Sequence, residues 1–268
     1  MEDPEILQQA VDNFVKLIPL GFLVGGYGAM VGAGGGFLLV PVLLLLLPDA
    51  SAVSLTSISL TVVFFAAYSG SISYARMGRI DYYNGLLLAA AGVPGIILGR
   101  MAVKLIENRT PFELGFGLIL LALGLYLALR PTDDGTPKAP YEETNGQSGR
   151  HWGAIGSAYV AALSGILGIG GGFMRVLLMT KLMRMTPHTA TATAVFILAL
   201  LALVGNVADV VTGDFFEGIN TTMFLAVGVM MGAPVGAALS QKIRGSSLIR
   251  LLALAICIVG GKLIWNAV

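Results

Sequence analysis

The chain has 268 residues, of which 56% are hydrophobic and 12% charged, and its formal net charge is +1. Soluble domains carry roughly 25% charged residues, and a surface that faces water must be covered by polar groups. The composition therefore excludes a soluble domain and indicates a protein that lies in a lipid bilayer. A net charge near zero gives no electrostatic basis for binding nucleic acid.

The chain begins with a polar, acidic stretch, residues 1–12, and the first apolar segment is expected at about 14–31. A secretory signal would start with positive charge and end at a small-residue cleavage site. Neither feature is present, so this segment is predicted to remain in the protein as a spanning helix.

A glycine-rich string at 32–36 interrupts the apolar sequence directly after this segment and is followed by a short apolar segment at 37–47. Consecutive glycines disfavour a helix. The short segment would reach roughly 17 Å, well below the roughly 30 Å of a hydrocarbon core. We therefore expect either half of a re-entrant hairpin or a spanning helix with thin ends.

Three longer segments complete the first half, at about 52–74, 82–99 and 112–129. Arg100 and Lys104 follow the second of these, and we expect them in or near the next loop. Residues 131–150 are rich in proline, glycine and charge, which is typical of a flexible linker.

The second half repeats this order. Its segments are expected at about 152–167, 173–183, 189–212 and 218–239, with a glycine break at 168–172 and a last segment that ends near 267. The predicted units are thus an N-terminal repeat (1–130), the linker (131–150) and a C-terminal repeat (151–268).

Matching residues extend the repeat beyond the glycines. Gly70-Ser71 corresponds to Gly205-Asn206, Pro94 to Pro234, and Thr56-Ser57 to Thr191-Ala192. Internal symmetry of this kind is typical of secondary transporters. With about five segments per half, the second half would enter the membrane upside down. The predicted fold is an all-α polytopic membrane protein of two inverted-topology repeats, each with a glycine-broken or re-entrant first helix pair.

Charge predicts the orientation of the chain. Loops on one side collect more lysine and arginine, including Arg76, Arg79, Lys181 and Arg184, than loops on the other, which collect Lys104 and Arg100 among others. The positive-inside rule makes the richer side cytoplasmic. We therefore expect a multi-pass protein of the cell (plasma or inner) membrane with a cytoplasmic linker and both termini outside.

The breaks predict an anion site. Each new helix begins with free N–H groups and a partial positive charge, which together bind anions, and glycine lets a small ligand approach the backbone. Hydroxyls early in the following helices could donate to oxyanion oxygens, although such groups more often bond neighbouring backbone. The candidate substrate-binding residues are Gly34, Gly35, Gly36, Phe37, Thr56, Ser57, Gly170, Gly171, Gly172, Phe173, Arg175, Thr191 and Thr193.

Arg175 falls in the first turn of its helix, where a cation opposes the helix dipole, and inside the apolar span, where it costs about 2.5–3.5 kcal/mol. It needs a partner, either a bound anion or Asp209. Asp209 and Asn206 form a polar pair in the segment at 189–212, and Asp209 is a candidate for a coupling or counter-ion role. The alternative interpretation is that Asp209 lies near the outer interface of the membrane and has no such role.

No cofactor is expected. Cys257 is the single cysteine and His151 and His188 are the two histidines, so cysteine-cluster and histidine-rich metal sites are excluded. Neither histidine falls deep in an apolar segment to act as a base, which disfavours an intramembrane enzyme.

The strings Gly32-Ala33-Gly34-Gly35-Gly36-Phe37 and Gly168-Ile169-Gly170-Gly171-Gly172-Phe173, with the helix starts Leu55-Thr56-Ser57 and Ala190-Thr191-Ala192-Thr193, resemble the sulfite exporter TauE/SafE family. The resemblance covers the whole chain apart from the N-terminal tail and the linker. It implies a transporter of small sulfur-containing anions, such as sulfite, sulfoacetate or related organosulfonates, usually for export. Leu177 departs from the pattern, because the first repeat has Pro41 at that place.

Several alternatives stay open. An anion channel would use the same helix ends without alternating states, a carrier could move another small anion, and a non-transporting scaffold would leave the repeated breaks unexplained. Whether a proton or sodium ion is coupled to transport is not determined by the sequence.

Overall fold

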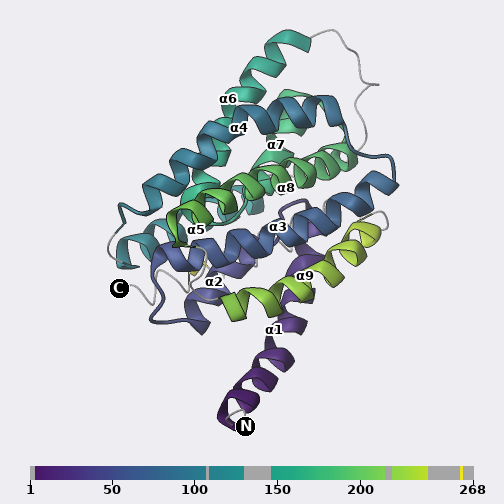
Figure 1. Ribbon diagram of the computed structural model, residues 1–268. Helices are drawn as coiled ribbons and strands as arrows, with labels where there is room; N and C mark the ends of the chain where they lie inside the picture. Colours follow the sequence, from purple (N-terminus) through teal and green to yellow (C-terminus); the bar gives the residue numbers. More distant parts are fainter. Residues whose placement is uncertain (1–3, 107–108, 130–145, 215–218, 241–259, 262–268) are drawn as a thin grey trace.

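The computed structural model describes residues 4–106, 109–129, 146–214, 219–240 and 260–261 (Figure 1). These residues form helices and connecting loops, with no strand among them. The expected last segment, and the linker as far as residue 145, lie outside the described residues. The named helices are α1 (Pro4–Val31), α2 (Gly36–Leu46), α3 (Ala52–Arg76), α4 (Tyr82–Val103), α5 (Arg109–Leu129), α6 (Gly146–Leu167), α7 (Gly172–Leu182), α8 (Pro187–Thr212) and α9 (Ile219–Leu239).

Five stretches of described helix are long and apolar enough to cross a membrane. They are 14–31 within α1 and the whole of α3, α4, α8 and α9. The short helices α2 and α7 have 11 residues each, as the sequence predicts. The all-helical membrane architecture is therefore confirmed.

The central helices α3 and α8 each begin at a residue whose side chain accepts a hydrogen bond from a backbone N–H of the first turn. Ser51 accepts from the N–H of Ser54 at the start of α3, and Thr186 accepts from the N–H of Thr189 at the start of α8. Such caps are worth about 1 kcal/mol each. The helices α2 and α7 have no such cap, because Gly35 and Gly171 occupy the position.

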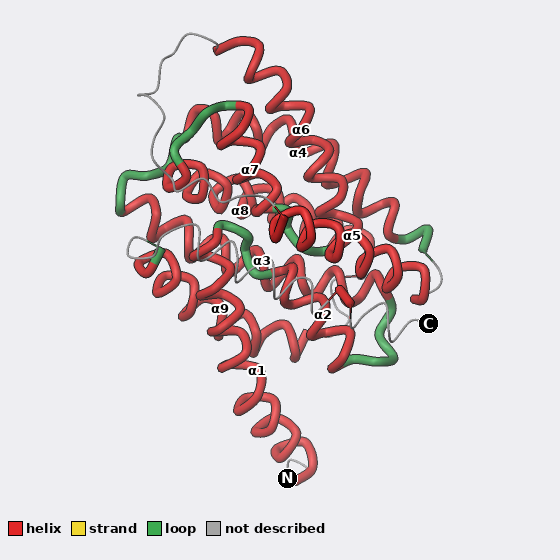
Figure 2. The backbone as a smooth tube through the Cα atoms, turned by 180° about the vertical axis from the view of Figure 1, so that it is seen from behind, coloured by secondary structure: helices red, strands yellow, loops and turns green. Residues whose placement is uncertain are grey.

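The centre of the bundle is formed by α3 and α8, which pack against each other. In Figure 1, α4 and α6 lie on one side of this pair and α1 and α9 on the other, and Figure 2 shows the same order from behind. The first helix of each half packs along a long helix of the other half, because α1 packs against α9 and α6 packs against α4. The N-terminal ends of α1 and α6 project from opposite ends of the molecule (Figure 1).

Small residues allow these outer pairs to approach closely. A Cβ placed on Gly236 of α9 would lie 1.8 Å from the carbonyl oxygen of Gly26 in α1, and one on Gly95 of α4 would lie 2.1 Å from that of Ala158 in α6. Contacts this short are possible only for glycine. Small residues at such interfaces replace the hydrophobic driving force that is absent between helices in lipid. The two outer pairs also pack against the central helices, α9 against α3 and α4 against α8.

Candidate functional site

The two glycine strings form tight turns that only glycine adopts readily. Gly34 and Gly35 have φ values of 71° and 82°, and Gly170 and Gly171 have values of 77° and 63°. These values lie in the left-handed region, where a Cβ is strained. Each turn ends one apolar helix and starts a short one, α2 or α7, in the interior of the protein.

The two breaks touch each other. A Cβ placed on Gly36, the first residue of α2, would lie 2.7 Å from the carbonyl oxygen of Ile169 in the other break. One placed on Gly172, the first residue of α7, would lie 2.3 Å from the carbonyl oxygen of Gly32. Two segments about half a chain apart therefore meet backbone to backbone, as the anion-site hypothesis requires.

The contact lies between the two central helices. Cβ atoms placed on Gly34 and Gly170 would both approach the side chains of Val63 in α3 and Leu198 in α8. Both breaks are buried, and so are the phenylalanines that follow them, Phe37 and Phe173. The N-termini of α2 and α7 thus lie together in the middle of the bundle, and neither has a side-chain cap.

Arg175 follows the second break by three residues and is the basic residue closest to it along the sequence. Its side chain is buried, with 1% of the residue exposed. Its Nη1 donates to the carbonyl oxygen of Gly170 at 2.7 Å, which anchors the side chain to its own break. Its Nε and Nη2 have no hydrogen-bond partner within the described residues. A buried guanidinium with unused donors is costly, and a bound oxyanion would supply both the missing acceptors and the missing negative charge.

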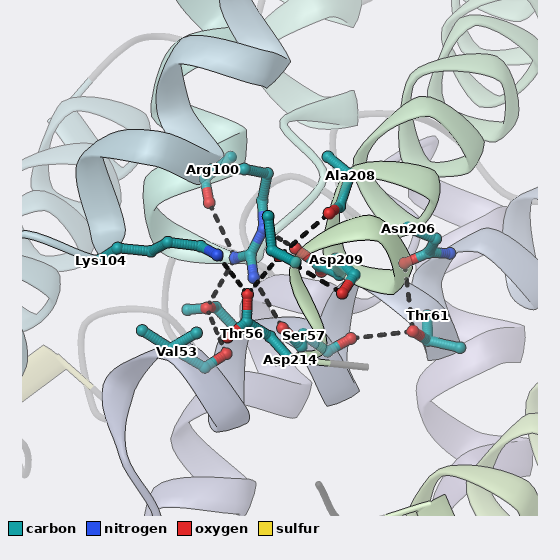
Figure 3. A network of polar contacts seen from close by, with 12 residues as sticks. Val53, Thr56, Ser57, Thr61, Arg100, Lys104, Asn206, Ala208, Asp209 and Asp214 are labelled. Carbon is teal, nitrogen blue, oxygen red and sulfur yellow. Dashed lines mark hydrogen bonds and ion pairs between the residues drawn. The ribbon is translucent and has the colours of Figure 1, made fainter. Parts of the chain in front are cut away.

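A second buried arginine, Arg100, lies near the end of α4 and is also 1% exposed (Figure 3). Its Nε donates to Oδ1 of Asp209 at 2.6 Å. Its Nη1 donates to Thr56 Oγ1 at 2.8 Å and to the carbonyl oxygen of Gly165 at 3.3 Å, and its Nη2 donates to Ser57 Oγ at 2.6 Å.

This network corrects two expectations. Arg100 does not lie in a loop, because α4 continues to Val103 and carries Arg100 into the interior. Asp209 does not pair with Arg175, because the packing of α4 against α8 brings the guanidinium of Arg100 to it. The pattern of basic residues after an apolar segment is typical of a loop, and only the tertiary contact separates a buried arginine from an exposed one.

The predicted hydroxyl residues are divided among different roles. Thr56 donates to the carbonyl oxygens of Ala52 and Val53, while its oxygen and that of Ser57 accept from Arg100. Thr56 also borders the second break, because a Cβ on Gly168 would lie 2.8 Å from its Cα. Thr56 therefore links the charged network to the second break.

The corresponding residues of α8 lie differently. Thr191 borders the first break, because a Cβ on Gly32 would lie 2.9 Å from its Cγ2. Thr193 accepts from the N–H of Asp81 at the start of α4, so its oxygen is engaged away from the breaks. Asn206 accepts from Thr61 at 3.1 Å, which joins α8 to α3.

A more exposed ion pair lies beside the charged network. Lys104 Nζ and Asp214 Oδ2 are 2.5 Å apart, and their side chains are 32% and 26% exposed. Partial burial raises the pKa of Asp214, but hydrogen bonds from Lys104 and Thr212 and the charge of Lys104 lower it by more, so its pKa lies below the ordinary value. Within the described residues, no group of three or more histidine, cysteine, aspartate or glutamate side chains could hold a metal ion.

The family model of the sulfite exporter TauE/SafE matches residues 17–263. The chain belongs to the sulfite exporter TauE/SafE family. The match covers both glycine breaks, both short helices and both buried arginines, so the family assignment and the geometry concern the same part of the molecule.

Curated relatives of this TauE/SafE protein have transporter names. It is 28% identical to "Probable membrane transporter protein YunE" of Bacillus subtilis, over 96% of this chain and 99% of the relative. It is 26% identical to a "Probable membrane transporter protein" of Xylella fastidiosa, over 96% and 97%, and 25% identical to "Probable membrane transporter protein MJ0441" of Methanocaldococcus jannaschii, over 86% and 89%. No solved structure matches the TauE/SafE chain.

Proposed function

We propose that this protein is a secondary transporter that moves small sulfur-containing anions, namely sulfite, sulfoacetate or related organosulfonates, out of the cell by alternating access. The substrate site lies at the touching glycine breaks near the middle of the membrane. The sulfur chemistry rests on membership of the TauE/SafE family. The location of the site is inferred from the contacts around the two glycine breaks.

The observation that carries the proposal is the buried contact between the breaks beside Arg175. Two uncapped helix N-termini meet there, and each supplies free N–H groups and a partial positive charge. Arg175 adds two unused donor nitrogens. Sulfite and sulfonate groups carry several oxygens around one sulfur, which suits donors that converge from different directions.

The order of the helices supports alternating access. Each outer pair, α1–α9 and α4–α6, consists of one helix from each half of the chain. The first helices of the two halves project from opposite ends of the molecule. This arrangement is the one expected of repeats inverted about an axis in the membrane plane. Inverted repeats provide two states of equal architecture, one open to each side of the membrane.

The orientation follows from charge. With Arg100 buried against Asp209, one basic residue fewer remains on the side that already had fewer. The positive-inside rule then favours a cytoplasmic linker and external termini in the cell membrane more strongly.

Reconstituted liposomes test the function. Sulfite and sulfoacetate are expected to be taken up with saturable kinetics and to compete with each other, whereas sulfate, thiosulfate and chloride are the comparison anions. Arg175→Ala is expected to weaken substrate affinity about tenfold or more, because a charge-assisted hydrogen bond contributes about 1.5–3 kcal/mol. Arg175→Lys should recover part of it.

Lys181→Ala provides a matched control, because Lys181 lies in the last turn of the same helix and is exposed. It removes the same charge without touching the breaks, and flux should stay near the unmodified level. Unchanged affinity in Arg175→Ala would remove Arg175 from the site. The channel alternative is tested by planar-bilayer recording, where unitary conductance steps in place of saturable flux would decide for a channel.

A further inference from the structure

The charged network around Arg100 has an uncharged counterpart elsewhere in the fold. The hydroxyl of Tyr74, near the end of α3, donates to the carbonyl oxygen of Ala29 at 2.9 Å and lies 3.2 Å from Ser240 Oγ. Tyr74 is 1% exposed, which differs from the membrane-interface position that a tyrosine often takes. We call Arg100, Asp209 and Gly165 the charged clamp, and Ser240, Tyr74 and Ala29 the neutral clamp.

The two clamps occupy equivalent positions of the sequence repeat. Ser71 corresponds to Asn206, and three residues later Tyr74 corresponds to Asp209. Pro94 corresponds to Pro234 in the same way, and six residues later Arg100 corresponds to Ser240. The residues three before the glycine strings, Ala29 and Gly165, are the carbonyl acceptors of the two clamps.

The clamps lie at opposite ends of the central helix α3. Ser57, which binds Arg100, is near the start of α3, and Tyr74 is near its end. At about 1.5 Å per residue the stretch between them is roughly 26 Å long, which approaches the roughly 30 Å of a hydrocarbon core. Val63, which borders both glycine breaks, lies between them. The two clamps therefore lie on opposite sides of the breaks along α3.

The clamps join helices of both halves. The charged clamp connects α4 to α6 and α8, and the neutral clamp connects α3 to α1 and to the residue that follows α9. Arg100 differs from Arg175 in a decisive respect. Its three nitrogens all have partners in the network, so it has no donor nitrogen left without a contact, whereas Arg175 has two.

We propose that the charged clamp and the neutral clamp are the two gates of the transport path, and that Arg100 and Asp209 are positioning residues which keep one gate closed. The proposal rests on the alternating-access function proposed above. Opening the gate at the charged clamp requires the separation of a buried ion pair, whereas opening the other requires the loss of the hydrogen bonds of Tyr74, with no ion pair among the described residues of that clamp. The two sides of the cycle therefore have unequal barriers, although their architecture is equivalent.

Cysteine accessibility tests the proposal without a substrate. Cys257→Ser gives a background without cysteine, because the chain has a single one. Two matched reporters, Ser71→Cys and Asn206→Cys, lie one turn inside Tyr74 and Asp209 respectively, so a reagent must pass a clamp to reach them. A membrane-impermeant maleimide is then applied to right-side-out and inside-out vesicles.

With both clamps intact, both reporters should react slowly. Asp209→Asn should raise labelling at position 206 about tenfold or more, from one side of the membrane only, and leave position 71 unchanged. Asp209→Glu, which keeps the charge, should stay close to the unmodified rate. Tyr74→Phe should raise labelling at position 71, by a smaller factor and from the opposite side.

An equal rise at both reporters in Asp209→Asn would indicate general loosening of the bundle and would overturn the proposal, as would no rise at position 206. Labelling of both reporters from the same side would also overturn it. Should Asp209→Asn not be recovered in folded form, Arg100→Gln applies the same test, because it removes the other charge of the ion pair.

The transport assay separates this proposal from the proposed function. If the unmodified protein moves neither sulfite nor sulfoacetate but the labelling pattern is observed, the substrate assignment is wrong and the gates stand. If flux is present and the labelling pattern is absent, the gates are wrong and the function stands.

Discussion

The contact between the two breaks can be tested by adding one methyl group. Gly172→Ala would place a Cβ 2.3 Å from the carbonyl oxygen of Gly32 and 3.1 Å from the Cα of Ala33. Ordinary contacts of this kind are at 3.4–4 Å, so the two backbones must separate by about 1 Å. Both neighbours are backbone atoms, and no change of rotamer relieves the clash.

Overpacking of a well-packed interior typically costs about 1–3 kcal/mol. Gly36→Ala should carry a cost in the same range, because a Cβ there would lie 2.7 Å from the carbonyl oxygen and 2.8 Å from the Cα of Ile169. The backbone conformation does not add strain at either position, since neither residue is among those with positive φ. The cost therefore reports the contact between the breaks.

Gly115→Ala is the matched control. Gly115 lies inside α5, is exposed, and has no atom within 4 Å of the position of a Cβ. There the substitution should stabilise the helix by up to about 1 kcal/mol, because alanine has the higher helix propensity. The double variant Gly36→Ala, Gly172→Ala should cost less than the sum of the single variants, because the first methyl group already separates the shared interface.

Thermal unfolding of the purified protein in detergent measures these differences, at about 2–4 °C for each kcal/mol. Gly36→Ala and Gly172→Ala are both expected to have a lower Tm than Gly115→Ala. If Gly172→Ala were as stable as Gly115→Ala, the two breaks would not touch, and the reasoning that places an anion between them would be refuted.

Four further predictions follow, three from individual contacts and one from the predicted orientation. Thr186→Ala removes the N-cap of α8 and should lower the free energy of unfolding by about 1 kcal/mol in thermal denaturation; a loss much above 2 kcal/mol would contradict a simple cap. Lys104→Met should change the free energy of unfolding by no more than about 1 kcal/mol, because the ion pair with Asp214 is partly exposed. The difference should shrink in high salt, which screens such a pair. Because folding lowers the pKa of Asp214 below 3.8, ionised Asp214 stabilises the fold above that pH and the contribution is lost as the pH falls through the lowered value; Asp214→Asn should abolish this dependence, and an unchanged acid profile would contradict it. A reporter fused within residues 131–145 should be active only in the cytoplasm, and external activity would reverse the orientation.

Local signals were sufficient for much of the fold. The absence of charge over long runs predicts the spanning helices, and consecutive glycines predict where they break. The short helices were expected at 37–47 and 173–183, and they are found at Gly36–Leu46 and Gly172–Leu182. These features depend on residues close together in the chain, so the sequence carries them directly.

The polar interior required the tertiary structure. Arg100 follows an apolar segment, and one further turn of helix decides whether it lies in a loop or against Asp209. That turn is stabilised by Asp209, Thr56, Ser57 and Gly165, which belong to three other helices, so no local pattern reports it. The sequence by itself determined that this chain lies in a membrane and that its apolar helices are interrupted at two glycine strings. Only the packing decided which of its buried charges are neutralised within the protein and which have donors without a partner there, because charges are compensated through space and not along the chain.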